Sequence, residues 1–468
     1  MTQSLLGYKK LSKAIRIAIL DVGKTNIKLS VIDENSKELF SERKSNDVVD
    51  AKPYPHFKPE VLTDWLCSKL SECCKEHQLT HFSVTTHACA AVFLKEDGSA
   101  VLPILDYEYE VINEINDEYN KLARDFKNTL SPELTGGLNL GRQIFWLQKK
   151  FPQEFEQTKT ILNLPQYCSY ILSGTLATEV TSLGCHSDLW DSVKQQYSNL
   201  TTTMGWDKLF PPIKKAYDSL GTIKPELVSK YNLSKNCEVI NGIHDSNASL
   251  FRYLKLYDEP FSVVSSGTWT ICMAPGSPLE NLDENKDTLA NTDAYGNPVA
   301  CSRFMGGREF ELIAGPKGPS TKFNHNNVKN CIDKKFFALP NFAGGSGPFA
   351  SAKSQIKGEV NTDADLACLG TLYCALMTDF CLNLIQAKGD LIIEGSLVGN
   401  DYFSQILAQL RPEQKILVSN DSSGTLIGTS MLTGEIEANK DALKPLGTFD
   451  KIPGLISYRD EWLSQIKQ

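Results

Sequence analysis

Two short polar turns, each with a glycine and each set between apolar runs, constrain this chain more than any other feature. The first turn, Asp21–Lys28, separates the apolar runs 17–20 and 29–32, and the second turn, Ser265–Thr270, separates 261–264 and 271–273. Each pattern predicts a strand, a tight turn and another strand. Because the tip of such a turn exposes backbone N–H groups and hydroxyls, it suits phosphate oxygens. A pair of these turns predicts two lobes that close on a polyphosphate.

The bulk composition narrows the class of protein. The chain has 468 residues, which is enough for two large domains. Its net charge of −8 argues against a broad nucleic-acid surface, which needs a basic face. The 13 cysteines form no CxxC pair and no signal peptide is recognised, so we expect a reducing, cytoplasmic compartment. We also expect that no apolar segment is long enough to span a membrane.

Strands and helices alternate along the chain, which predicts the α/β class. A short apolar strand at 237–241 precedes a helix over 246–254, and a new strand-rich section opens at Phe261. We therefore expect two domains, 1–250 and 251–468. Further expected elements are a strand at 38–44, a helix at 59–76, strands at 82–85 and 91–94, helices at 140–151 and 167–172, a long helix at 363–388, a strand at 391–393 and a helix from 421 to 431.

The turn after the first strand is a candidate loop for phosphate and metal. Asp21 would hold Mg²⁺ through water, and Lys24, Thr25 or Asn26 would lie near the phosphates. The alternative is an ordinary hairpin in which Gly23 supplies a positive φ. The Walker pattern GxxxxGK[ST] is missing, so the loop is not a P-loop.

The second turn is a candidate for binding a β- or γ-phosphate through Gly267 and Thr268, and the alternative is again a plain hairpin turn. A third candidate loop, Glu394–Asn400, follows a strand, and its glycine would let the backbone approach a nucleotide base. The alternative for this loop is a simple turn from strand to helix. The glycine-rich loop 340–348 either touches the nucleotide or is a surface connection.

Asp245 lies after a strand and before a helix, and two interpretations are open. Aspartate is among the best N-cap residues, so its role could be purely structural. In the other interpretation, the helix N-terminus favours the ionised carboxylate. That carboxylate would accept a hydroxyl proton and orient the oxygen for in-line attack on a phosphoryl group.

Four polar residues of the N-terminal half are candidates for binding substrate hydroxyls. His87 follows the run 82–86, His186 and Asp188 share a polar loop, and Gln166 precedes an apolar helix. A lone histidine is more often a structural residue with satisfied hydrogen bonds, and this alternative holds for the whole group.

Taken in order, these motifs resemble the FGGY family of carbohydrate kinases, within the actin-like and hexokinase-like ATPase superfamily. The combination of His-Asp-Ser with Ser-Ser-Gly-Thr-Trp is similar to the rhamnulokinase and L-fuculokinase branches. The resemblance covers nearly the whole chain through the motifs Ile19–Asn26, Val84–His87, Gly242–Ser246, Val264–Trp269, Glu394–Asn400 and Ser423–Gly428.

The resemblance implies two ribonuclease H-like domains around a central cleft, with ATP mainly on the second domain and the sugar mainly on the first. Three departures from the family stand out. Glu394 precedes Gly395 where several glycines are usual, and Lys24 stands where a small or hydroxyl residue is usual. The stretch Thr86–Cys89 differs from the aromatic or charged pattern of well-known branches, so the substrate is not carried over from them. The residues that match family positions are Asp245 as the catalytic base, Asp21 on the metal side, Gly267 and Thr268 in the second phosphate loop, Gly395, Ser396 and Asn400 in the adenosine loop, and His87 in the sugar-contacting stretch.

We therefore expect an ATP-dependent sugar kinase that transfers the γ-phosphoryl group of Mg·ATP to a hydroxyl of a ketose or polyol. A catalytically weak sugar or nucleotide sensor of the same fold is the alternative. The expected partner is a small-molecule sugar or polyol, with neither nucleic acid nor membrane, and a homodimer is left open.

Overall fold

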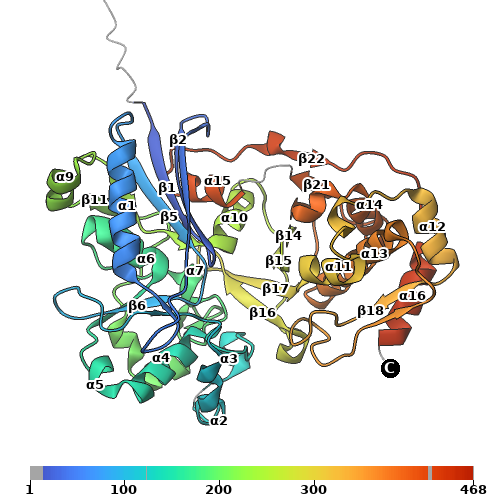
Figure 1. Ribbon diagram of the computed structural model, residues 1–468, viewed down its shortest axis with the longest axis horizontal. Helices are drawn as coiled ribbons and strands as arrows, with labels where there is room; N and C mark the ends of the chain where they lie inside the picture. Colours follow the sequence, from blue (N-terminus) through green and yellow to red (C-terminus); the bar gives the residue numbers. More distant parts are fainter. Residues whose placement is uncertain (1–13, 123, 420–423, 467–468) are drawn as a thin grey trace, which may run out of the picture.

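The chain forms two mixed sheets with helices packed around each (Figure 1). The computed structural model describes residues 14–122, 124–419 and 424–466. The first sheet has the order β11-β12-β5-β1-β2-β3 with β13 beside β5, and the second has the order β16-β17-β15-β14-β20-β21-β22. Their strands are β1 Arg16–Val22, β2 Asn26–Asp33, β3 Glu38–Ser45, β5 His81–Thr86, β11 Ser219–Thr222, β12 Glu238–Ile240 and β13 Ile243–His244, then β14 Ser262–Ser266, β15 Thr270–Pro275, β16 Thr288–Thr292, β17 Pro298–Phe304, β20 Leu391–Gly395, β21 Ile416–Ser419 and β22 Leu443–Pro445.

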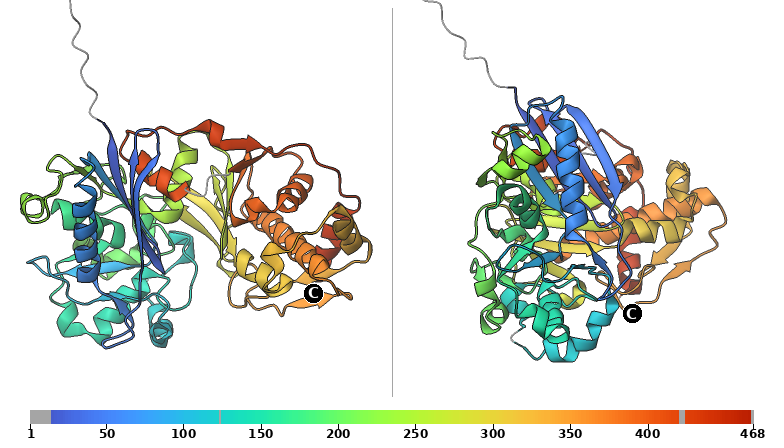
Figure 2. Two further views of the ribbon diagram at one scale, coloured as in Figure 1. Left: turned by 45° about the horizontal axis from the view of Figure 1, so that its top comes forward. Right: turned by 60° about the vertical axis from the view of Figure 1, so that its left-hand side comes forward.

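The helices surround these sheets on both sides (Figures 1 and 2). The longer ones are α1 Pro59–Cys73, α4 Leu140–Lys150, α6 Leu164–Ser173, α9 Pro225–Tyr231, α10 Asp245–Leu254, α11 Gly306–Ala314, α12 His325–Asp333, α13 Asp363–Leu384, α14 Asp401–Leu410, α15 Gly424–Met431 and α16 Leu455–Ile466. The shorter ones are α2 Asn116–Tyr119, α3 Phe126–Thr129, α5 Pro152–Phe155, α7 Val180–Leu183 and α8 Asn199–Thr203, with 3₁₀ turns at Glu110–Ile115, Trp206–Leu209, Glu284–Lys286, Gly318–Ser320, Ser396–Gly399 and Lys440–Ala442. Small two-stranded sheets join β4 His56–Phe57 to β7 Ile104–Leu105, β6 Ala91–Leu94 to β8 Thr160–Asn163, β9 Trp190–Asp191 to β10 Gln196–Tyr197, and β18 Phe337–Leu339 to β19 Gln355–Lys357.

The two large sheets repeat one pattern of strands. In each, a first strand (β1 or β14) pairs antiparallel with the strand that follows it and parallel with a later one (β5 or β20). A further parallel strand (β12 or β21) lies beside that later strand. This is the ribonuclease H-like duplication that the sequence predicted. The two glycine turns therefore occupy equivalent places, one between β1 and β2 and the other between β14 and β15.

Helix α1 illustrates how the sequence sets a local element. Pro59 begins the helix, where its missing N–H costs no hydrogen bond. Leu62, Leu66 and Leu70 recur every four residues and are buried in the core of the first domain. Val61, on the opposite side, is half exposed. The helix thus covers the first sheet with one apolar face, as its spacing predicts.

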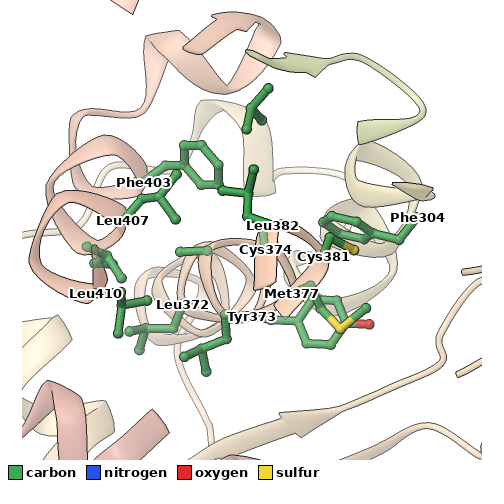
Figure 3. Packing of buried hydrophobic residues seen from close by; sticks show 14 of the residues in the cluster. Phe304, Leu372, Tyr373, Cys374, Met377, Cys381, Leu382, Phe403, Leu407 and Leu410 are labelled. Carbon is green, nitrogen blue, oxygen red and sulfur yellow. The ribbon is translucent and has the colours of Figure 1, made fainter. Parts of the chain in front are cut away.

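Helix α13 forms the centre of the second core (Figure 3). Tyr373, Met377 and Cys381 on this helix and Phe403 on α14 are among the buried residues of this cluster. The helix is 22 residues long and apolar enough to cross a membrane by length and composition, so the expectation that no segment reaches that length was wrong. Within the protein, 83% of its most apolar window is buried, which is typical of a core helix.

Two helices lie between the sheets and pack against each other, α10 from the middle of the chain and α15 from near its end (Figure 1). On α10, Ala248 and Phe251 pack with residues of the first sheet, whereas Leu250 and Tyr253 pack with residues of the second. A division of the chain at residue 250 would fall within this shared helix. The predicted start of α15 at residues 421–423 lies outside the described residues.

All 13 cysteines are free thiols, and 12 of them are buried. They behave as small apolar residues of the core. No disulfide framework therefore contributes to the fold.

Candidate active site

A cavity of about 410 Å³ is lined by residues of both domains. Asp21 and Gly23 come from the end of β1 and its turn, Asp245 begins α10, Ser265 lies on β14 and Gly395 ends β20. Four predicted site residues, Asp21, Gly23, Asp245 and Gly395, thus meet around one space. The fold places the ends of the central strands of both sheets at this cavity.

The pairing of β5 explains why Asp21 and Asp245 face the same cavity. On one side of β5, Thr85 lies opposite Asp21 of β1, and on the other side Thr85 lies opposite Ile243 of β13. Asp245 follows β13 directly. Since neighbouring strands are about 4.8 Å apart, the backbones that carry Asp21 and Asp245 flank the end of β5 on strands roughly 10 Å apart.

Asp21 is a carboxyl group with an altered acidity. Burial and, to a smaller extent, the Asp245 carboxylate raise the pKa of Asp21 to about 6, and Lys28 and Arg43 only partly oppose this shift. A carboxylate that is buried near another carboxylate is stabilised when a cation approaches. This is the electrostatic setting of a metal-side aspartate.

Asp245 is the first residue of α10, and His244 occupies the N-cap position without a side-chain cap. The interpretation of Asp245 as an N-cap is therefore wrong. Its Oδ1 accepts hydrogen bonds from the Ser246 N–H at 2.5 Å and the Ser246 hydroxyl at 3.2 Å, and it lies 3.0 Å from His244 Nε2. Among the described residues, no hydrogen bond reaches Oδ2, and the side chain is 37% exposed. Oδ2 is thus free to bind a substrate hydroxyl.

The charge on Asp245 is set by its neighbours. Burial alone would raise its pKa, but the charge and hydrogen bond of the His244 ring and the Ser246 N–H together hold the pKa below its usual range. The carboxylate is therefore ionised at neutral pH, which is the form that accepts a proton.

The β1–β2 turn is held by its own backbone and by one asparagine. The Gly23 N–H donates to Asn26 O at 2.8 Å, and Asn46 donates to the carbonyls of Gly23 and Thr25 at 2.9 Å each. Gly23 has no positive φ, so that explanation of the glycine was wrong; an added Cβ would lie 3.1 Å from Asn26 O. Thr25 and Asn26 are exposed at the tip, and their contact with phosphate stays a prediction.

Lys24 turns toward the interior of the first domain. Its ammonium forms ion pairs with Asp106 and with Glu108, the latter at 3.3 Å. It also lies 5.1 Å from the ring centroids of Phe57 and Tyr107. In this arrangement the charge of Lys24 is already paired within the first domain, and a contact with phosphate stays a prediction.

The β14–β15 turn has a similar closed geometry. The Gly267 N–H donates to Trp269 O at 2.8 Å, and Gly267 and Thr268 are exposed. Gly307, at the start of α11, lies against Gly267 O so closely that an added Cβ would be 2.3 Å from it. The predicted role of this turn at the phosphates stays a prediction; the turn follows Ser265, which lines the cavity.

Gly395 allows two strands to meet at the cavity. Its φ is 88° and its ψ is −156°, a conformation that only glycine adopts readily, and an added Cβ would lie 2.0 Å from Ser266 O. Ser396 donates to Ser266 O at 3.4 Å, and Asn400 donates from its amide to the Thr371 hydroxyl at 2.7 Å. These contacts fix the loop; its predicted role at adenosine is not tested by them.

Sequence reasoning missed an ionic network at the wall of the cavity, which Glu394 and Ser249 themselves line. The Glu394 carboxylate accepts hydrogen bonds from Ser249 at 2.7 Å, Arg252 at 2.6 Å and Tyr253 at 2.6 Å. Those three partners lie on α10, whereas Glu394 lies on β20. The network therefore ties the helix that carries Asp245 to the second sheet. Its one sequence signal was the glutamate at a position where the family usually has glycine.

The four candidates for sugar binding differ in their environments. His87 Nδ1 donates to Ala88 O at 2.8 Å, whereas its buried Nε2 has no hydrogen-bond partner among the described residues. Burial lowers the pKa of His87, so the ring is neutral and Nε2 is an acceptor. The other three have structural contacts: Gln166 with Asn241 O and Gly242 O, His186 with Leu138 O, and Asp188 with Tyr119 and Arg124. Sugar binding by these residues stays a prediction.

The raised pKa of Asp21 predicts a pH-dependent penalty to stability. The folded protein binds this proton more tightly than the unfolded chain, so stability falls as pH rises from about 4 to about 6. We expect Asp21→Asn to increase the free energy of unfolding of the ligand-free protein at pH 7.5 by about 3 kcal/mol, and by much less at pH 4.5. Urea unfolding at the two pH values measures this difference, and an equal gain at both would contradict the assigned pKa.

The donor groups around the cavity fit a magnesium ion that is held mainly by phosphates. Among the described residues, no cluster of three or more His, Cys, Asp or Glu side chains could hold a metal by itself. Mg²⁺ is usually bound through one or two carboxylates, substrate phosphates and several waters. Asp21, with its raised pKa and the nearby Asp245 carboxylate, supplies this kind of incomplete site.

The fold and the cavity define a two-domain protein of the actin-like ATPase class. The sequence profile of the FGGY family of carbohydrate kinases, N-terminal domain, matches residues 16–252, and that of the carbohydrate kinase FGGY, C-terminal domain, matches residues 258–442. The chain belongs to the FGGY family of carbohydrate kinases. This confirms the resemblance that the motifs indicated.

Individual relatives are more distant. L-Fuculokinase of Escherichia coli K12 is 23% identical over 274 residues, which cover 56% of this chain and 57% of the relative. Rhamnulokinase of Halalkalibacterium halodurans is 22% identical over 261 residues, 54% of each chain. The chain therefore spans a little over half the length of these curated relatives. A carbohydrate kinase from Novosphingobium aromaticivorans superimposes with a TM-score of 0.88 at 29% identity, over 97% of this chain and 99% of that one.

Proposed function

We propose that this protein is an ATP-dependent kinase that transfers the γ-phosphoryl group of Mg·ATP to a hydroxyl of a ketose or polyol. The observation that carries the proposal is that Asp21, Asp245 and Gly395, from three separate parts of the chain, line one cavity between the domains. Family membership supports the reaction class, and the substrate is a proposal from the geometry.

Asp245 acts as the general base. Its ionised Oδ2 accepts the proton of the acceptor hydroxyl while that oxygen attacks the γ-phosphorus in line. Because phosphoryl transfer depends mostly on positioning and on charge stabilisation, a weakly basic carboxylate is sufficient. The γ-phosphoryl group is transferred to the acceptor oxygen, and ADP is the leaving group. The proton is released from Asp245 to water after the product departs.

The two glycine turns supply the phosphate contacts. Backbone N–H groups and hydroxyls at 23–26 and 267–268 stabilise the charge that develops on the phosphate oxygens. Mg²⁺ bound near Asp21 would neutralise part of this charge. The glycine-rich backbone at Gly395 lets the nucleotide lie close to the end of β20.

The acceptor lies on the side of the first domain. His87 Nε2, which is buried and has no partner among the described residues, accepts a hydrogen bond from a second hydroxyl of the sugar. Leaving such an atom unpaired costs free energy, so a substrate with a hydroxyl at this place is favoured. The Lys24 charge is paired with Asp106, which favours a neutral sugar over a sugar acid.

A substrate panel tests the proposal. Ketoses, aldoses, alditols and sugar acids are assayed with Mg·ATP by coupled detection of ADP, and the product is identified by mass spectrometry. We expect at least one neutral ketose or alditol to give a phosphate ester with acceptor-dependent ADP release. Tight ADP binding without phosphorylation of any acceptor would contradict the proposal.

A further inference from the structure

His244 precedes Asp245 in the chain and contacts its carboxylate, but it takes no part in the reaction described above. Its side chain is buried, and its backbone N–H donates to the Thr181 hydroxyl at 3.0 Å, which fixes its position. Its Nε2 lies 3.0 Å from Asp245 Oδ1 and 3.8 Å from Cys185 Sγ. The ring therefore connects the catalytic carboxylate to a buried thiol of the first domain.

The other ring nitrogen of His244 contacts Asn247, one turn later on α10. Asn247 Nδ2 lies 3.2 Å from His244 Nδ1, whereas Asn247 Oδ1 is buried without a partner among the described residues. When the Asn247 amide is turned end for end, Oδ1 takes the place of the nitrogen and accepts a hydrogen bond from the Nδ1–H of His244. The ring then donates from both nitrogens and the unsatisfied oxygen gains a partner. This arrangement is the one that suits an imidazolium.

The charges that face His244 favour the same protonated form. The groups that can carry negative charge are Asp245 on α10, Cys185 after α7 and Glu179 before α7, and the nearby ring of His87 after β5 is neutral. Burial disfavours the charged ring, but Cys185 and Asp245 outweigh it and hold the pKa of His244 well above its ordinary value. Burial raises the pKa of the Cys185 thiol, but the neighbouring rings of His186 and His244 outweigh this effect and lower the pKa to about 5.

We propose that His244 is a positioning residue for phosphoryl transfer: its imidazolium holds Asp245 Oδ1 in place and leaves Oδ2 directed to the acceptor hydroxyl. Together with the Ser246 N–H and hydroxyl, it gives Oδ1 three donors, whereas Oδ2 has none among the described residues. A carboxylate whose side chain is 37% exposed would otherwise rotate and exchange its two oxygens. The inference rests on the proposed function, because it concerns the base of that reaction.

The inference extends to the charge of the site. Asp245 and Asp21 both line one cavity, so two carboxylates of like charge face the same space. The His244 imidazolium offsets this repulsion on the Asp245 side before any cation binds. His244 therefore makes two separable contributions, the hydrogen bond that holds Oδ1 and the positive charge.

Two variants separate these contributions. His244→Ala removes both, whereas His244→Gln keeps a side-chain N–H donor without the charge. We expect His244→Ala to lower kcat by roughly 10- to 100-fold, since small displacements of a catalytic group have effects of this size, with the KM for ATP changed by less than about threefold. We expect His244→Gln to recover part of kcat. In both variants, the acid limb of the pH profile of kcat should move to higher pH.

The matched control is His77→Gln, because His77 is a partly exposed histidine just after α1 that does not line the cavity. Its kcat and pH profile should equal those of the wild type. An unchanged kcat and acid limb in folded His244→Ala would overturn the proposal; if that variant fails to fold, an unchanged acid limb in His244→Gln decides against it. Asp245→Asn is assayed in parallel. If the wild type phosphorylates no acceptor, the proposed function fails; if only Asp245→Asn loses activity, the role of His244 alone fails.

Discussion

Asp245→Asn should lower kcat by roughly 10²–10⁴-fold while the protein folds normally and binds ATP with little change. The amide keeps the size of the side chain and its place at the start of α10, but it cannot accept the proton of the acceptor hydroxyl. The measurement is the initial rate of acceptor-dependent ADP release, together with calorimetric titration of ATP. A variant with near-normal turnover would show that another group is the base.

The control for Asp245→Asn is Asp50→Asn, an exposed aspartate of the first domain that does not line the cavity. Both variants remove one negative charge, so an effect of net charge alone would appear in both. Only the variant at 245 should lose turnover.

Gly395→Ala should have the second large effect, on both stability and nucleotide binding. Gly395 adopts a φ of 88° and a ψ of −156°, and for another residue this conformation costs roughly 1–3 kcal/mol. The new Cβ would also lie 2.0 Å from Ser266 O, so the ends of β14 and β20 must separate. Because β14 leads into the turn at Gly267, we expect kcat/KM for ATP to fall by roughly 100-fold. Urea unfolding and steady-state kinetics measure the two losses.

Gly399→Ala is the matched control for Gly395→Ala. Gly399 ends the short 3₁₀ turn Ser396–Gly399 that follows Gly395 directly. It has no positive φ, and no atom lies within 4 Å of an added Cβ. Its stability and its KM for ATP should remain close to those of the wild type. Similar losses in both variants would mean that the loop as a whole is sensitive, and that the contact of Gly395 with Ser266 has no special role.

The sequence predicted those parts of the fold that depend on local chemistry. Apolar runs around Asp21–Lys28 and Ser265–Thr270 specify strands and turns without reference to the rest of the chain. The spacing of Leu62, Leu66 and Leu70 likewise specifies a helix and its buried face. The long apolar helix was also expected, although it ends at Leu384, since Gln386 and Gly389 both take positive φ.

Contacts between distant residues could not be predicted in this way. Lys24 pairs with Asp106, and Glu394 pairs with Arg252, because tertiary packing brings these charges together. The approach of Cys185 to His244 depends on the loop after α7 folding onto the end of β13. No periodicity or turn signal encodes such pairs. Sequence reasoning therefore found four of the residues that line the cavity, Asp21, Gly23, Asp245 and Gly395, but missed the charged groups that pair across the fold.

The two glycines at positions 23 and 395 show a further limit of prediction from the sequence, which concerns the physical reason for a glycine. A glycine in a tight turn usually indicates a positive φ, yet Gly23 has none and instead lies close to Asn26 O. Gly395, by contrast, was expected to let the backbone approach a nucleotide base, and its positive φ serves first to let two strands meet. Each glycine was identified as important, and only the structure gives the physical reason.

The most direct test of the central claim is a crystal structure with Mg²⁺ and a non-hydrolysable ATP analogue. The account predicts that the triphosphate lies in the cavity lined by Asp21, Asp245 and Gly395, with the γ-phosphate between the β1–β2 and β14–β15 turns and the Asp245 side chain facing it. A nucleotide bound outside this cavity, or an Asp245 side chain turned away from the γ-phosphate, would contradict it.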